Sequence, residues 1–274
     1  MDLLLPKNNV CACKGIRTCL SCETNKMPLL QDNIAKSGLV YRYCHHCCKA
    51  FADSDHTSHP DHKGDSVPLE GVVICEDFIS SEEEDRLVSK IYETPFVDSQ
   101  SGRRKQDYGP KVNFKKQKVK TEVFSGLPQF SQFIYERMTS ISALARFAPV
   151  ELCNLEYDAS RGASIDPHFD DFWLWGERLV TVNLLSDSIL CFTRDDKPDV
   201  EIHVLMPRRS LIVVAGEARY RWKHGIHRSD INGRRIAMTF RELSNEFKDG
   251  GTKEQFGKQL VDLALTFGGR AVGS

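Results

Sequence analysis

The chain has 274 residues, of which 37 are basic and 38 acidic, and its pI is about 6.8. This balance excludes a protein that binds nucleic acid through its overall charge, although a local basic patch is compatible with it. No apolar run approaches the roughly 18 residues that a membrane span needs, and the N-terminus lacks the pattern of a secretory signal. We therefore expect an intracellular protein of the cytoplasm and nucleus that does not bind membranes.

The first 66 residues are rich in Cys and His. Seven of the ten cysteines lie between Cys11 and Cys48, and in a reducing compartment such clustering favours metal binding over disulfides. Further candidate metal ligands in this region are Cys48, His45 and His46. Spacing in the sequence is the only support for three more, His56, His59 and His62. The thiolates suffice for one structural zinc site with four cysteine ligands, drawn from Cys11, Cys13, Cys19, Cys22, Cys44 and Cys47.

We therefore predict a Zn(II)-binding module over residues 1–66 and a second domain over residues 67–274. The second domain opens with a strand over 71–75. A capping box, Ser80-x-x-Glu83, marks the start of a helix that runs to about residue 92. Two more helices are predicted, over residues 130–145 and 253–265.

A basic segment lies between the first two helices. Residues 103–120 contain eight Lys and Arg against a single acid, Asp107, with Tyr108 and Phe114 among them. Basic and aromatic residues together suit contacts with phosphates and bases, and an acidic protein surface would be attracted equally well. The alternative is a solvated charged loop.

Short β-rich runs alternate along the chain after Val150, and their spacing is typical of a double-sheet jelly roll. The predicted fold class is thus mainly β with flanking helices (α+β): a double-stranded β-helix (jelly-roll) core with a small Cys-rich module. The predicted strands are 151–157, 178–185, 189–193, 200–206, 210–215 and 235–241.

Three residues in this region have the types and spacing of an iron site. His168 and Asp170 are two residues apart, so that both reach the same side of a strand, and His224 follows 56 residues later. Two His and one carboxylate leave three metal positions open, as in non-haem Fe(II) oxygenases. His227 is an alternative to His224, and we expect it to be a surface histidine.

Two arginines near the end of the chain are candidate co-substrate ligands. Arg235 and Arg241 are six residues apart and therefore lie on one face of a strand, where they could bind a dicarboxylate through charge-assisted hydrogen bonds. The alternate residues Ile236, Met238 and Phe240 are apolar. This alternation favours a buried pocket face over a solvated strand face.

The order Tyr157…His168-x-Asp170…His224-Gly-Ile…Arg235-x5-Arg241 resembles the AlkB family of Fe(II)/2-oxoglutarate dioxygenases. Segments 13–22, 101–113 and 173–178 are similar to the fourth animal branch of that family. The resemblance implies that Fe(II) binds His168, Asp170 and His224, that Arg235 and Tyr157 hold the distal carboxylate of 2-oxoglutarate, and that Arg241 lies near the iron-bound carboxylate.

The chain departs from the family pattern at two positions near the co-substrate. Leu155 stands where bacterial members have an Asn, with Asn154 one residue away, and Ala237 replaces a residue that is often polar. We expect fewer contacts to the co-substrate. We expect Asp171 to cap or orient the ligand segment and not to bind the metal. We expect Trp173 and Trp175 to pack in the core or to form a wall of the substrate pocket.

The resemblance implies oxidative demethylation, in which a methyl group on nitrogen is hydroxylated and lost as formaldehyde. By likeness to the fourth branch, the substrate would be a methylated lysine in a protein, with actin, and myosin through it, as the implied partners. Methylated DNA carrying N6-methyladenine is the alternative substrate. A zinc-binding interaction protein with a vestigial oxygenase barrel is the alternative of another class.

Overall fold

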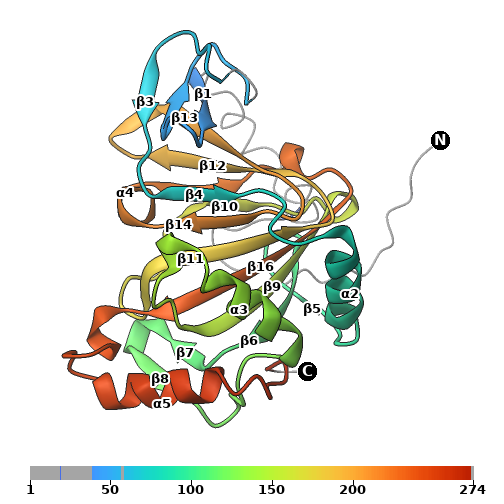
Figure 1. Ribbon diagram of the computed structural model, residues 1–274, viewed down its shortest axis with the longest axis vertical. Coiled ribbons are helices and arrows are strands. Elements are labelled where there is room, and N and C mark those ends of the chain that lie inside the picture. Colours follow the sequence, from blue (N-terminus) through green and yellow to red (C-terminus); the bar gives the residue numbers. More distant parts are fainter. Residues whose placement is uncertain (1–18, 20–38, 57–58, 273–274) are drawn as a thin grey trace.

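The computed structural model describes Cys19 and residues 39–56 and 59–272. These residues form two seven-stranded β-sheets that face each other, accompanied by helices. In Figure 1 one sheet lies above the other, with α2 beside the lower sheet and α5 at its lower end. No helix in the described part of the chain is long and apolar enough to cross a membrane.

The upper sheet, here called the histidine sheet, has the strand order β10-β15-β12-β13-β1-β2-β3. All its neighbouring strands pair antiparallel except β1 and β13, which are parallel. Its strands are β1 (Leu39–Cys44), β2 (Lys49–Phe51), β3 (Ser66–Pro68), β10 (Ile165–His168), β12 (Ser188–Arg194), β13 (Lys197–Met206) and β15 (Lys223–Ile226).

The lower sheet, here called the arginine sheet, has the order β4-β14-β11-β16-β9-β6-β5 and is antiparallel throughout. The two sheets confirm the predicted mainly β, jelly-roll fold class. Its strands are β4 (Val72–Cys75), β5 (Val97–Asp98), β6 (Arg104–Tyr108), β9 (Pro149–Asp158), β11 (Trp175–Leu184), β14 (Leu211–Val214) and β16 (Arg234–Leu243).

In the described part of the chain four α-helices accompany the sheets: α2 (Ser81–Tyr92), α3 (Gln132–Met138), α4 (Gly216–Tyr220) and α5 (Glu254–Ala264). The predicted capping box is present, because Ser80 Oγ accepts from the Glu83 amide and the Glu83 carboxylate accepts from the Ser80 amide. The helix predicted over 130–145 is wrong in length. It ends at Met138, where the hydroxyls of Thr139 and Ser140 donate to carbonyls of its last turn.

Strand alternation divides the buried apolar side chains into two clusters. Ile236, Met238 and Phe240 of β16 belong to the cluster that packs under the helices. Ala237 belongs to the cluster between the sheets, where Tyr157 of β9 is also found. The odd-numbered residues of β16 therefore face the space between the sheets, as the alternation in the sequence predicted.

The second half of the Cys/His-rich region is hydrogen-bonded to the barrel. Strand β1 pairs with β13 from Leu39 opposite Val200 to Arg42 opposite His203, and β2 and β3 extend the same sheet. The boundary predicted at residue 66 falls at the first residue of β3. The division of the chain into two units stays a prediction.

Candidate functional site

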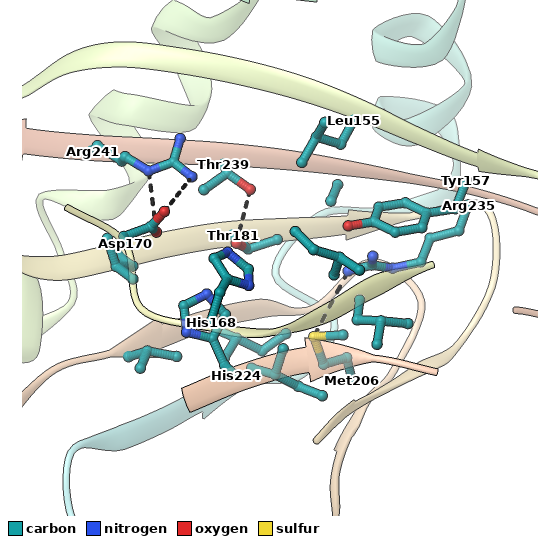
Figure 2. Close-up of a pocket in the computed structure, with 17 residues that line it drawn as sticks. Leu155, Tyr157, His168, Asp170, Thr181, Met206, His224, Arg235, Thr239 and Arg241 are labelled. Carbon is teal, nitrogen blue, oxygen red and sulfur yellow. Dashed lines mark hydrogen bonds and ion pairs between the residues drawn. The ribbon is translucent and has the colours of Figure 1, made fainter. Parts of the chain in front are cut away.

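A pocket opens between the two sheets and contains the predicted site residues (Figure 2). Residues of β9 and β16 form one wall, and residues of β10, β12 and β15 form the opposite wall. The side chains that line it are those of Leu155, Tyr157, Ile165, His168, Asp170, Leu179, Thr181, Leu190, Met206, Ile212, Val214, His224, Ile226, Arg235, Ala237, Thr239 and Arg241.

His168 and His224 are paired directly across two antiparallel strands, β10 and β15, so their side chains emerge on the same face. Their ring centroids are 4.6 Å apart. Burial lowers the pKa of His224 to about 3, and the nearby His168 acts in the same direction. His224 is thus a neutral imidazole, and its buried Nδ1 has no hydrogen-bond partner, as suits a metal ligand.

Asp170 supplies the carboxylate. Its two oxygens lie 3.3 Å from Nε and Nη2 of Arg241. Burial acts to raise the pKa of Asp170, but the positive charge of Arg241 outweighs it and holds the pKa well below its usual range. Two imidazoles, that of His224 neutral, and an ionised carboxylate in one pocket fit an Fe(II) ion of the two-His, one-carboxylate type.

The predicted strand placement of Asp170 is wrong in one respect. Strand β10 ends at His168, so Asp170 lies in the turn that follows. Asp171 Oδ1 accepts from the amide of Leu174 at 2.9 Å, which closes the turn. Asp171 therefore caps this turn, as expected, and the turn presents Asp170 to the pocket.

Arg235 lies at the other end of the pocket and is 1% exposed. Its Nε donates to Asn183 Oδ1 at 2.6 Å, and its guanidinium carbon lies 5.0 Å from the ring centroid of the buried Tyr157. Burial lowers the pKa of Arg235, and its buried Nη1 has no hydrogen-bond partner. A buried cation with an unused donor fits one carboxylate of a dicarboxylic co-substrate such as 2-oxoglutarate.

Arg241 is already bound within the protein. Its Nη1 donates to Glu151 at 2.6 Å, and it also contacts Asp170. Burial acts to lower the pKa of Arg241, but the two carboxylates outweigh it and raise the pKa. Of the two arginines predicted to hold the dicarboxylate, Arg235 has the unused donor, whereas Arg241 lies beside the candidate metal ligand Asp170.

Two mammalian proteins are similar to this chain over nearly its whole length. The human "Alpha-ketoglutarate-dependent dioxygenase alkB homolog 4" is 44% identical over 96% of this chain and 95% of its own length. The mouse protein of the same name is 43% identical over 96% of both chains. The chain belongs to the AlkB family. It is therefore a 2-oxoglutarate-dependent dioxygenase, and AlkB-type enzymes use Fe(II) with that co-substrate.

A third relative is the "DNA N6-methyl adenine demethylase" of Caenorhabditis elegans, which is 36% identical over 92% of this chain and 94% of its own length. No family model matches the chain. Among solved structures, OsALKBH1 aligns with 64% of this chain and all of its own, at a TM-score of 0.44 and 14% identity. The family membership therefore rests on the sequence relatives.

The co-substrate end differs from the bacterial AlkB pattern as the sequence indicated. Leu155 and Ala237 line the pocket. Asn154 points to the other face of β9, where its Nδ2 donates to Gln106 Oε1 at 2.9 Å. It therefore cannot replace the missing Asn contact.

Sequence reasoning gave no role to three polar residues: Thr181 and Thr239 line the AlkB pocket, and Asn183 contacts the lining residue Arg235. Asn183 orients Arg235, and the hydroxyls of Thr181 and Thr239 lie 3.2 Å apart across β11 and β16. A polar residue within an apolar strand, as in Val-Asn183-Leu-Leu, was the available signal, because a buried amide needs partners. Asn183 Nδ2 finds them in the backbone carbonyls of Ser186, Met206 and Pro207.

The tryptophans and the alternative histidine lie outside the pocket. Trp175 is buried in the cluster under the helices, and the ring of Trp173 packs against Phe247. Neither lines the iron pocket: Trp175 packs in the core, whereas Trp173 lines a separate groove with Phe172 and Tyr220. His227 Nε2 donates to the carboxylate of Glu201 at 2.8 Å, away from His224.

The basic segment divides into a tied part and an exposed part. Arg103 is buried, Arg104 pairs with Glu156, and Lys105 pairs with Asp107, so these three have structural roles. The rest is a hairpin of β7 (Lys111–Asn113) and β8 (Lys118–Lys120), here called the lysine hairpin. It has no acidic residue, and its five exposed lysines are Lys111, Lys115, Lys116, Lys118 and Lys120.

The structure brings together part of the predicted zinc cluster. Cys44 and Cys47 lie near each other, with His59 and His62 beside them. Cys19 is buried. Cys11, Cys13 and Cys22 lie outside the described residues.

Proposed function

We propose that this chain is an oxidative demethylase that removes methyl groups from nitrogen with Fe(II) and 2-oxoglutarate. One observation carries the proposal: the unused donor of the buried Arg235 shares a pocket with the two-His, one-Asp set. A co-substrate that chelates iron at one end and ends in a carboxylate at the other satisfies both. With O2 as the oxidant, bound iron and 2-oxoglutarate would supply the hydroxylating chemistry: one oxygen atom enters the methyl group, the other enters the co-substrate, and succinate and CO2 leave.

The chain's own residues prepare this reaction. His168 and His224 would bind the metal as neutral imidazoles, and Asp170 as a carboxylate that Arg241 keeps ionised. Arg235, oriented by Asn183, would hold the distal carboxylate against the ring of Tyr157. The apolar residues of the pocket limit the water around these groups, which strengthens each charge interaction.

We propose a methylated lysine in a protein as the substrate, with actin as the partner that the likeness to alkB homolog 4 implies. A groove beside the iron site supports a cationic substrate. It is lined by Phe172, Trp173 and Tyr220, and by the acidic residues Glu177 and Glu246. Aromatic faces and carboxylates together attract ammonium groups, including methylated ones.

Two lining residues of the groove, Trp173 and Glu246, contact a lysine of this chain. Lys253 Nζ lies 5.0 Å from the Trp173 ring centroid and 2.7 Å from Glu246. The groove also adjoins the metal ligand, because Arg219 lies 4.7 Å from the Phe172 ring and donates to the backbone carbonyl of Asp170. A lysine-containing segment in this groove would lie close to the iron pocket.

N6-methyladenine in DNA is the second candidate. The name of the Caenorhabditis elegans relative and the five lysines of the lysine hairpin support it. The hairpin adjoins the Arg241 end of the pocket, since the exposed Phe114 ring lies 6.3 Å from that of Trp175. Arg241 in turn lies 5.9 Å from Trp175. An acidic protein surface fits the same lysines.

The test is a turnover assay with Fe(II) and 2-oxoglutarate that measures formaldehyde and succinate together. A methyl-lysine protein, a methyl-lysine peptide and an N6-methyladenine oligonucleotide are compared at equal concentration. We expect turnover of the methyl-lysine protein above that of the oligonucleotide, and its loss in His224→Ala. Turnover of the oligonucleotide alone would reverse the order of the two substrates, and turnover of none would contradict the demethylase.

A further inference from the structure

A second group of metal-ligand residues lies far along the histidine sheet from the iron pocket. Cys44 ends β1, Cys47 lies in the turn between β1 and β2, and His59 and His62 lie in the connection from β2 to β3. One donor atom from each of the four lies within 4.8 Å of all the others. The spacing in the sequence is Cys-x2-Cys-x11-His-x2-His, close to that of zinc sites with two Cys and two His.

The distances within the group match the edges of a zinc tetrahedron. His59 Nδ1 lies 3.7 Å from Cys44 Sγ and 3.5 Å from Cys47 Sγ. Zinc bonds of about 2.3 Å to sulfur and about 2.0–2.1 Å to nitrogen, at tetrahedral angles, place S and N about 3.6 Å apart. The two contacts are therefore at the separation that a shared zinc ion requires.

His62 gives an independent indication of a ligand. Both of its ring nitrogens are buried and have no hydrogen-bond partner. Its ring is stacked on Phe51, with centroids 4.0 Å apart and planes 10° apart, which fixes its orientation. A buried polar group without a partner costs about 1–3 kcal/mol, and a metal bond to one ring nitrogen would remove part of this cost.

We propose that Cys44, Cys47, His59 and His62 bind a structural zinc ion. The site is closed, with four protein ligands, so it has no open position for a substrate. It differs from the all-cysteine site predicted from the sequence, because two histidines replace the N-terminal thiolates. The ion would join the β1–β2 turn to the β2–β3 connection and so hold three strands at the edge of the sheet.

This location ties the zinc site to the barrel without involving it in the iron chemistry. Strand β1 pairs with β13, and the Tyr43 hydroxyl donates to the Val72 carbonyl at 3.2 Å, next to β4. Tyr41 and Tyr43 are buried in the cluster between the sheets. Loss of zinc should therefore loosen β1 to β3 first, while β10 and β15, which carry His168 and His224, lie at the opposite edge of the sheet.

The experiment measures zinc per chain in the purified full-length protein. Cys47→Ser and His59→Ala should each lose one zinc relative to the unmodified chain. Cys48→Ser is the matched control, because this exposed thiol contacts the His45 carbonyl and lies outside the group. A four-serine variant should keep the proposed zinc; it combines Cys11→Ser, Cys13→Ser, Cys19→Ser and Cys22→Ser.

X-ray absorption on this four-serine variant gives the ligand set in a protein whose proposed site is unchanged. We expect two sulfurs at about 2.3 Å and two nitrogens at about 2.0–2.1 Å. His59→Cys should keep the zinc with three sulfurs, which separates loss of a ligand from failure to fold. Zinc bound by sulfur alone, or a four-serine variant without zinc, would overturn the proposal.

Discussion

The histidine sheet carries a cluster of histidine and carboxylate on each of its two faces. On the inner face, His224 lies opposite Phe192 and joins His168 and Asp170 in the pocket. On the outer face, Cys191 lies opposite His203, and the donor atoms of Cys191, Glu201, His203 and His227 lie within 4.8 Å of one another. The two clusters thus contain similar residue types at similarly short distances from one another.

The two clusters differ in how their hydrogen bonds are satisfied. On the outer face, one oxygen of Glu201 contacts Nε2 of His203 at 2.5 Å and Nε2 of His227 at 2.8 Å. These hydrogen bonds lower the pKa of Glu201 to about 2, and the bond to Glu201 raises the pKa of His227. On the inner face, His224 is neutral and its Nδ1 is unpartnered. Polar groups that are hydrogen-bonded to one another form a structural cluster, whereas a buried polar group without a partner is available to a ligand.

The largest effect should come from replacing one histidine of each cluster, His224 or His227, by alanine. His224→Ala removes a metal ligand, so 2-oxoglutarate turnover should fall at least about 100-fold, to near background, since changes to residues that only support the ligands cost about 10–100-fold. His227→Ala should stay within about twofold of the unmodified enzyme. Circular dichroism on both variants checks that they fold. Full activity in His224→Ala with loss in His227→Ala would reverse the assignment of the two clusters.

The next effect concerns the co-substrate end of the pocket. Removing one partner of a buried charge pair costs about 2–5 kcal/mol, so Arg235→Ala should raise the 2-oxoglutarate concentration for half-maximal turnover by about 30-fold or more. The iron requirement should change far less. Arg234→Ala is the matched control, because this neighbouring side chain is 52% exposed. If Arg235→Ala and the control needed the same 2-oxoglutarate concentration for half-maximal turnover, Arg235 would not be a co-substrate ligand.

A smaller effect is expected at the lysine hairpin. Replacing Lys115, Lys116 and Lys118 by Glu should reduce turnover of a folded methyl-lysine protein several-fold, because contacts with an acidic surface become repulsive. A short methyl-lysine peptide lacks that surface and should be affected less. DNA binding should be weak near physiological salt. Tight binding with a log–log salt slope of about −0.7 to −0.9 per phosphate contact would instead favour the DNA substrate.

The smallest effect is the pH dependence of the outer cluster. Because the pKa of His227 is raised, its contribution to stability is fully present below the ordinary His pKa and is lost as pH rises through the raised value. Because the pKa of Glu201 is lowered, its contribution is present above the ordinary Glu pKa and is lost as pH falls towards 2. The carboxylates of Asp230 and Asp166 also raise the pKa of His227, and the His203 ring is hydrogen-bonded to Glu201.

We therefore expect Glu201→Gln to lower the free energy of unfolding most between about pH 4.5 and 6.5. The loss should be no more than about 1 kcal/mol, because His227 is 42% exposed and solvent screens the pair. Urea unfolding at about pH 5.5 and about pH 8.5, on either side of the ordinary His pKa, measures it. A larger loss at the higher pH than at the lower would contradict the expected sign.

The sequence predicted the parts of this molecule that depend on periodicity and residue type. Alternation placed Arg235 and Arg241 on the inner face of β16, and the residue types of His168 and Asp170 marked both as ligands of one pocket. The end of β10 at His168 was not predictable in the same way, since a local turn closed by Asp171 decides it.

Long-range pairing explains most of the remaining differences. The parallel pairing of β1 with β13 joins residues about 160 positions apart, for which no local pattern exists. The role of Asn183 depends on Arg235, which lies on the neighbouring strand. His59 and His62 could be placed beside Cys44 and Cys47 only once the strands β1 to β3 had brought their connections together.

The most direct test of the central assignment is binding of 2-oxoglutarate to the Fe(II)-loaded protein without oxygen, followed by the visible charge-transfer absorption of the iron chelate. We expect this absorption in the unmodified chain and in His227→Ala, its absence in His224→Ala, and its appearance in Arg235→Ala only at much higher 2-oxoglutarate. The same absorption in His224→Ala as in the unmodified chain, or none in either, would contradict an iron site formed by His168, Asp170 and His224.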